Sequence, residues 1–196
     1  MNAESKRQTK VTWEKLQLQT KVFSGKLSDA LGELGIFEAC KDLQIDHICV
    51  RIKNDQDVDV LKTQLLEKGQ MISSVNVNGR EISMFQLDEA LDLGTWQTSA
   101  VELPFPKSNH KYIDGWEHVE FVLDTKENTI KGVREAFMIK FPNLDLAMLK
   151  SDFSYSEDEP HAEGDQIPNP TVGLKVNGVG VKFHANPIQV VVGFVV

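Results

Sequence analysis

Ionisable side chains stand inside a stretch that otherwise has the composition of a buried strand. The segment DGWEHVEFVL (114–123) carries His118 between Glu117 and Glu120, and most of the residues around them are apolar. Alternate residues of a strand share a face, so His118 and Glu120 are predicted to project to the same side. Burying such groups is costly unless a partner compensates them. A bound cation would be such a partner.

A second stretch, IDHICVRI (45–52), has the same character. It contains His47, and Arg51 four residues later falls on the same face of the predicted strand. Glu102, in VELPFP, and His184, in VKFHANP, lie on later predicted strands. If the first and last strands of two similar units come together, these side chains can converge with His118.

The residue types predict which metals such a site would hold. Mixed imidazole and carboxylate ligation suits Zn, Ni, Fe(II), Mn or Co and disfavours ions that prefer thiolates. A metal that acts as a Lewis acid needs few protein ligands, so that positions remain for two substrate oxygens. We therefore predict a divalent metal site with the ligands His47, Glu102, His118 and His184.

Each of these residues also has a structural interpretation. A single histidine in a strand is commonly a hydrogen-bonded core residue, and Glu102 beside Pro104 fits a solvated strand edge. Arg51 and Arg80 fit surface positions or ion pairs. His110 and His161 fit solvated positions in loops, and His184 fits a solvated position at the end of a strand.

The elements that must position these residues follow from the hydrophobic pattern. Apolar residues between Phe23 and Leu34 recur with a helical period, which predicts an N-terminal helical segment over 1–42. Beyond it the order strand, helix, strand, strand, strand is predicted twice, over 43–104 and 105–196. We therefore expect an α+β fold in which two βαβββ units form a curved mixed sheet around a central cavity, within one compact domain.

Turn and loop signals support this division. Asn78-Gly79 and Asn177-Gly178 separate strand-like runs and favour tight hairpin turns. The acidic segment 151–167 is predicted to be a solvated loop, with a lid as the alternative. The apolar C-terminal segment 187–196 is predicted to be a buried strand or a last segment docked on the core.

Composition excludes several classes of function. The 196 residues are 41% hydrophobic and 26% charged, with a net charge of −8, as in an ordinary soluble globular protein. No basic run alternates with aromatic residues, so nucleic-acid binding is not expected. Neither a signal peptide nor a membrane-spanning segment is predicted. Two cysteines outside a CxxC pair, Cys40 and Cys49, read as reduced thiols of a cytoplasmic protein.

Several of these motifs together resemble a known family. DHICVR, NGREISMFQL, VELPFP, GWEHVEFVL, PNPT and VKFHANPI are similar to segments of the YecM family of bacterial proteins. The resemblance implies a fold like that of the vicinal oxygen chelate superfamily, which includes glyoxalase I and extradiol dioxygenases. It also implies metal ligands at His47, Glu102, His118 and His184. Many isomerases of that superfamily have glutamate at the last position, which argues against a direct transfer of glyoxalase activity.

The resulting hypothesis is a metal-dependent enzyme of isomerase, lyase or oxygenase type, whose small substrate chelates the metal through vicinal oxygens. Glu120 is the candidate general base, and Arg51 and Arg80 are candidates for holding an anionic substrate group. One alternative is a non-catalytic small-molecule-binding protein of the same fold. Another is an interaction protein whose apolar C-terminal segment meets a partner.

Overall fold

The computed structural model describes residues 11–77, 79–107, 113–144, 153–160 and 162–194. The elements of the first part of the chain are α1 (Trp13–Glu33), α2 (Phe37–Cys40), β1 (Ile45–Arg51), α3 (Asp55–Leu66), β2 (Gly69–Val77), β3 (Arg80–Leu93) and β4 (Trp96–Pro104). They are followed by β5 (Gly115–Val122), α4 (Ile130–Lys140), β6 (Phe153–Asp158), β7 (Thr171–Val176), β8 (Val179–His184) and α5 (Ile188–Val191).

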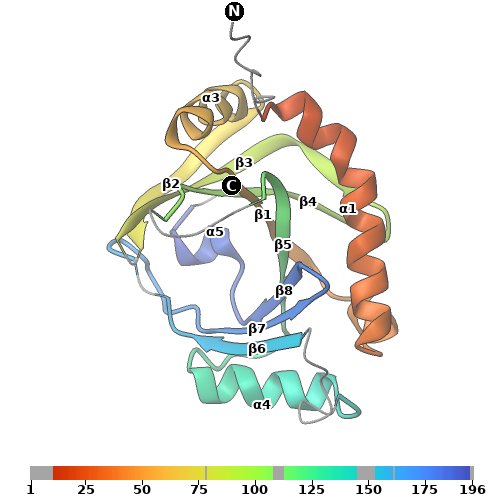
Figure 1. The fold of residues 1–196 in the computed structure, drawn as a ribbon. Coiled ribbons are helices and arrows are strands. Elements are labelled where there is room, and N and C mark those ends of the chain that lie inside the picture. The colour runs from red at the N-terminus through yellow and green to blue at the C-terminus, as the bar shows by residue number, and fades with distance from the viewer. Residues whose placement is uncertain (1–10, 78, 108–112, 145–152, 161, 195–196) are drawn as a thin grey trace, which may run out of the picture.

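The described strands form one mixed sheet of eight strands in the order β2-β3-β4-β1-β5-β8-β7-β6. Two pairs are parallel, β1 with β4 and β5 with β8, and the two middle strands β1 and β5 are antiparallel. The sheet curves around α5, while α1, α3 and α4 lie on its outer side (Figure 1). The predicted α+β class is therefore confirmed.

The order of elements brings the two histidine-bearing strands together. Along the chain, β1-α3-β2-β3-β4 is followed by β5-α4-β6-β7-β8. The first strands of the two series, β1 and β5, lie side by side at the centre of the sheet. His47 is in register with Glu120, and two residues further along Cys49 is in register with His118. Two segments that are about seventy residues apart in sequence thus become neighbours.

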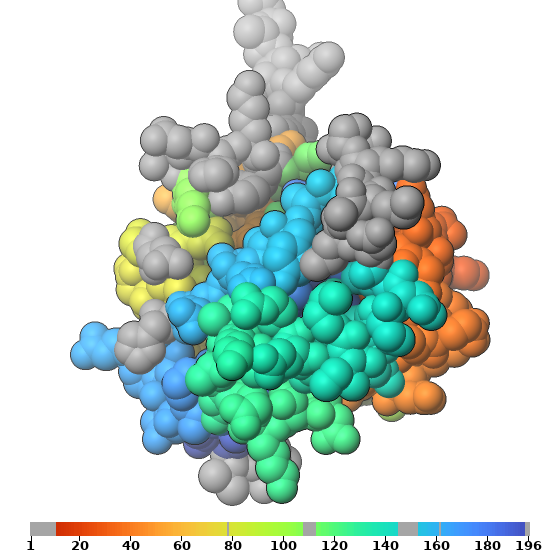
Figure 2. All heavy atoms as spheres, turned by 90° about the horizontal axis from the view of Figure 1, so that it is seen from below, coloured from red at the N-terminus to blue at the C-terminus, as the bar shows by residue number. Residues whose placement is uncertain are grey.

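Strand alternation divides apolar from ionisable residues. On β5, Val119 and Phe121 are fully buried on one face. His118 and Glu120 share the other face, where their side chains meet His47 and Glu102. Phe121 stacks on Phe183 of β8 with ring centroids 5.6 Å apart, and Phe137 of α4 meets Phe183 at 5.1 Å. Figure 2 shows α4 lying across this outer face. Burying each such ring stabilises the fold by about 1.5–3 kcal/mol.

Helix α1 has the apolar period that the sequence predicted. Its side chains Phe23, Leu27 and Leu31 are buried, and it begins after Thr12, whose hydroxyl caps the backbone N–H of Lys15. The indole N–H of Trp116 on β5 donates to the carbonyl of Leu16, which fastens the helix to the central strand. No helix of the described residues is long and apolar enough to cross a membrane.

Three local predictions differ from the structure. The segment 153–158, which was predicted to belong to a solvated loop, forms the edge strand β6, because its backbone pairs with β7 while its acidic side chains stay exposed. The C-terminal segment does not form the predicted buried strand; the alternative prediction, a last segment docked on the core, agrees with the short helix α5, whose Val191 is buried. The run REISMFQL predicted a strand over 80–87, whereas β3 continues to Leu93. It passes a register shift between Gln86 and Leu91, where exposed acidic residues interrupt the alternation in the sequence.

The predicted turn at 177–178 is confirmed. Asn177 and Gly178 both have positive φ, 49° and 83°, as a tight hairpin turn requires. Gly79 also has a positive φ of 82°, while Asn78 lies outside the described residues. The segment LDLAMLKSDF (144–153), from which a strand of the second unit is predicted, falls mostly on residues 145–152, which are likewise outside them.

Candidate metal centre

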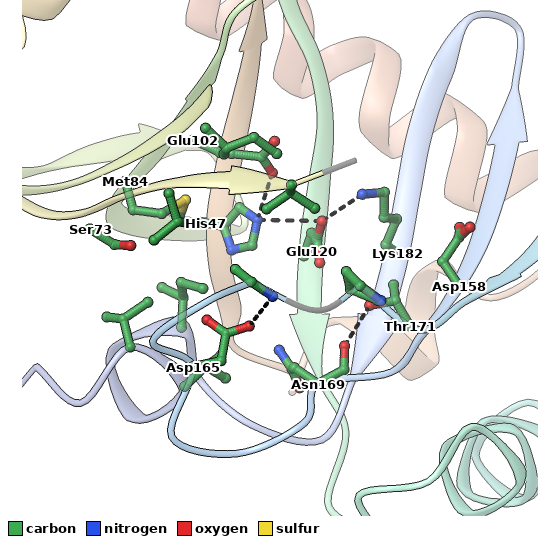
Figure 3. Close-up of a pocket in the computed structure, with 18 of the residues that line it drawn as sticks. His47, Ser73, Met84, Glu102, Glu120, Asp158, Asp165, Asn169, Thr171 and Lys182 are labelled. Atoms are coloured by element: carbon green, nitrogen blue, oxygen red, sulfur yellow. Dashed lines mark hydrogen bonds and ion pairs between the residues drawn. The ribbon is translucent and has the colours of Figure 1, made fainter. Parts of the chain in front are cut away.

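A cavity of about 460 Å³ lies on the inner side of the curved sheet. Its floor is formed by residues of the strands, including His47, Glu102 and Glu120, and α5 contributes Ile188 and Val191 to the opposite side. Figure 3 shows His47, Glu102, Glu120 and Lys182 pointing toward one another from four strands. The ionisable groups of the two apolar stretches therefore meet at one place.

Four of these side chains form a buried cluster whose ligand atoms all lie within 4.8 Å of one another: His47, Glu102, His118 and Glu120. Nε2 of His47 lies 3.3 Å from Oε2 of Glu102 and 3.4 Å from Oε1 of Glu120. Nε2 of His118 lies 3.7 Å and 3.3 Å from the same two oxygens. All four residues are at most 7% exposed.

The outer nitrogen of each ring is held by a further carboxylate. Nδ1 of His47 lies 2.8 Å from Oδ2 of Asp46, and Asp46 also accepts the backbone N–H of Ile188 at 2.9 Å. Nδ1 of His118 lies 3.1 Å from Oε2 of Glu117, which Arg51 engages through Nε. Carboxylates in this position keep the proton on Nδ1 and leave Nε2 as the ligand atom, as in many metal sites.

The donor set fits a divalent metal ion. Neither Nε2 atom makes a hydrogen bond within the described residues, although both are buried. Ligands held tetrahedrally at about 2.0–2.2 Å from a metal lie about 3.3–3.6 Å apart, close to the separations found in this cluster. His47, Glu102, His118 and Glu120 could therefore hold a metal ion.

The charges around the two histidines of the cluster favour their protonated forms. Burial opposes the charge of His47, but Glu120, Asp46 and Glu102 outweigh it and raise its pKa well above the usual value. Burial likewise opposes the charge of His118, whose pKa is raised by neighbours that include Cys49 and Glu102. Without a cation, protons would therefore occupy the rings, and a metal would have to displace them.

The pKa values of the two carboxylates of the cluster are shifted in the opposite direction, downward. Burial would raise the pKa of Glu102, but His118 and His47 hold it well below the usual value. In Glu120, Lys182 and His47 overcome burial and lower the pKa in the same way. Both groups are thus available as anionic ligands at neutral pH.

Of the predicted metal ligands, His184 lies outside this cluster. Its Nε2 is 3.4 Å from Oδ2 of Asp46 and 3.7 Å from Oε2 of Glu120. Its Nδ1 is 2.7 Å from the backbone carbonyl of Asn186, to which only a protonated Nδ1 can donate. His184 is fully buried, and burial lowers its pKa. Its Nε2 makes no hydrogen bond within the described residues, and together with Asp46 and His47 the residue forms a second buried group that could hold a metal ion.

Two further residues at the site were missed from the sequence. Lys182 of β8 lies in register with Glu120, and its Nζ is 2.7 Å from Oε1 of that carboxylate. Lys182 and His184 alternate with Val181 and Phe183, so the strand pattern placed both on the inner face, and Lys182 could have been found there. Asp46, which holds His47, gave no comparable signal.

The predicted substrate-binding arginines both line the cavity. Arg51 forms an ion pair with Glu117. Arg80 donates from a guanidinium nitrogen to the carbonyl of Phe105 at 3.4 Å, and its buried Nε makes no hydrogen bond within the described residues. His110 and His161 lie outside the residues that the structure describes.

Comparisons with known proteins point to one family. Its sequence model, described as YecM protein, matches residues 12–194. Protein YecM of Escherichia coli strain K12 is 30% identical over 150 residues, which is 76% of this chain and 77% of that protein. An uncharacterized protein of Haemophilus influenzae is 28% identical over 153 residues, covering 74% and 76% of the two chains.

A solved structure described as "Structural Genomics, Protein EC4020" has the same fold. Its TM-score is 0.76 at 24% identity, and the match covers 92% of this chain and 91% of the other. The likeness supports the arrangement of strands and helices. With the family match over nearly the whole described chain, it leads to the conclusion that this protein belongs to the YecM family.

Proposed function

We propose that this protein is a metal-dependent enzyme of isomerase, lyase or oxygenase type, and that its small substrate chelates the metal through vicinal oxygens. The observation that carries the metal proposal is the convergence of two Nε2 atoms on two carboxylates at 3.3–3.7 Å, with both Nδ1 atoms held by other carboxylates. In this buried arrangement either two protons on the rings or one divalent cation between them balances the two carboxylates.

The metal would be held by His47, Glu102, His118 and Glu120, with Zn, Ni, Fe, Mn or Co as candidates. When bound, it would supply Lewis-acid chemistry to a substrate in the adjoining cavity. Glu120, which we considered as a general base, is better suited to a ligand role because its Oε1 lies beside both rings. Arg80 would hold an anionic group of the substrate at the cavity wall.

The fold agrees with this proposal. We infer that 43–104 and 105–196 are two related βαβββ units, with 1–42 packed on them, as in the vicinal oxygen chelate superfamily. The element order and the equivalent parallel pairs β1–β4 and β5–β8 support the inference. A non-catalytic small-molecule-binding protein of the same fold is the second candidate, since the cavity alone would serve it.

The test is elemental analysis of protein purified without an affinity tag or chelator. The wild type is expected to carry metal near one equivalent per chain, and the His47→Ala/His118→Ala variant is expected to carry none. The His110→Ala/His161→Ala variant, which removes the same number of imidazoles from predicted loops, serves as the matched control. Circular dichroism would establish that each variant is folded.

Two outcomes would oppose the proposal. A wild type that lacks metal and takes up none on reconstitution would favour the binding protein. Equal metal content in both double variants would show that the cluster is not the site.

A further inference from the structure

Lys182 brings a positive charge to the proposed metal centre. Its side chain projects from β8 into the cavity, and its Nζ lies 2.7 Å from Oε1 of Glu120, the oxygen that also stands beside both histidines (Figure 3). Lys182 forms an ion pair with Glu120, a carboxylate of the four-residue cluster. Its ammonium is thus in direct contact with a proposed ligand.

The place of Lys182 in the sheet is equivalent to that of Glu102. In the parallel pair β1–β4, Glu102 is in register with Cys49, and in the parallel pair β5–β8, Lys182 is in register with Glu120. Both side chains therefore stand on the inner face, one strand away from a central strand. The second half of the sheet presents an ammonium group where the first half presents a carboxylate.

The lysine, at a position equivalent to that of a carboxylate, changes the charge that a ligand in the cavity would meet. A divalent metal is balanced by the carboxylates of Glu102 and Glu120, and Glu117 pairs with Arg51. Asp46 offsets Lys182 in the total charge but is fully buried against His47, whereas Lys182 lines the cavity, so its ammonium is the charge that a ligand beside the metal meets. Acidic residues also line the cavity: Glu157, Asp158, Glu159 and Asp165. A single negative charge on the ligand would be attracted by Lys182 at the floor, whereas a second one would be repelled by these carboxylates.

We propose that Lys182 makes the site selective for small monoanionic chelators, such as 2-hydroxy carboxylates, over neutral chelators of the same shape. The inference rests on the proposed metal function and adds a substrate class to it. Lys182 acts here as a specificity-determining residue: it stabilises the ligand's negative charge beside the metal and forms no bond to the reacting atoms.

The test compares glycolate with glycolamide, which share a hydroxyl and a carbonyl oxygen but differ by one negative charge. Each is titrated into the full-length protein loaded with cobalt(II), and the visible spectrum of the metal reports both cobalt occupancy and ligand binding. The wild type is expected to prefer glycolate over glycolamide by about tenfold more than aqueous cobalt does. Lys182→Gln is expected to abolish that excess, and Lys182→Arg is expected to retain it.

Lys175→Gln is the matched control, because Lys175 is an exposed lysine of the adjacent strand β7 and does not line this cavity. It should keep the wild-type preference. A wild type whose preference equals that of aqueous cobalt would overturn the inference without any variant, and so would an unchanged preference in Lys182→Gln. In both of these outcomes the protein still shows the visible spectrum of bound cobalt. Failure of the proposed function is distinguishable, since the wild type would then show no spectrum of bound cobalt, and the inference would fall with it.

Discussion

Gly180 lies directly beside His118 in the parallel pair of β5 and β8. A Cβ atom added at Gly180 would stand 2.6 Å from Cβ of His118, which is closer than such atoms approach in proteins. The absence of a side chain at this position therefore leaves the room that the imidazole needs to reach the cluster.

Gly180→Ala is accordingly expected to displace His118 and to weaken metal binding by about tenfold or more, as loss of ligand orientation does. Isothermal titration with cobalt(II) would measure the affinity. Gly132→Ala is the matched control, since its added Cβ would stand 2.2 Å from Cβ of Glu127, in α4 on the outer side of the sheet. Equal affinities in the two variants would show that Gly180 does not position His118.

The acid stability of the fold should depend on Glu117. Burial would raise the pKa of this carboxyl, but His118 and Arg51 hold it at about 2, below the usual 4.5. A carboxyl with a lowered pKa stabilises the folded state at pH values above about 4.5, and this contribution is lost as the pH falls toward 2. We expect the free energy of unfolding of Glu117→Gln to change less than that of the wild type between these pH values.

Urea unfolding followed by circular dichroism would measure both curves in metal-free protein. Glu127→Gln, which alters an exposed carboxylate after β5, should follow the wild type. The same acid dependence in Glu117→Gln and in the wild type would contradict the prediction.

Metal binding should release protons. Glu120, Asp46 and Glu102 raise the pKa of His47 above the usual 6.5, and neighbours that include Cys49 and Glu102 raise that of His118. Both rings therefore hold a second proton at neutral pH in the absence of a cation. Since a metal binds only the unprotonated Nε2, the affinity should rise with pH, with up to about two protons released per metal. Calorimetry in buffers of different ionisation enthalpy would count them. The absence of proton release at neutral pH would show that the rings are already neutral.

Much of the fold follows from local patterns in the sequence. The helical period between Phe23 and Leu31 predicted α1, and the Asn177-Gly178 pair predicted a turn that both positive φ values confirm. Such features are local, because they depend on residues within a few positions of one another. By contrast, β6 owes its strand structure to pairing with β7, and its acidic composition concealed it.

The candidate site divides in the same way. Strand alternation alone determined that His118 and Glu120 share a face, and likewise Lys182 and His184. The register between β5 and β8 decides which residue of the second pair lies opposite Glu120. It places Lys182 opposite Glu120, and His184 opposite Val122. Register arises from packing between segments about sixty residues apart, which no short stretch encodes. The sequence by itself determined which residues could do chemistry, and only the tertiary structure decided which of them meet.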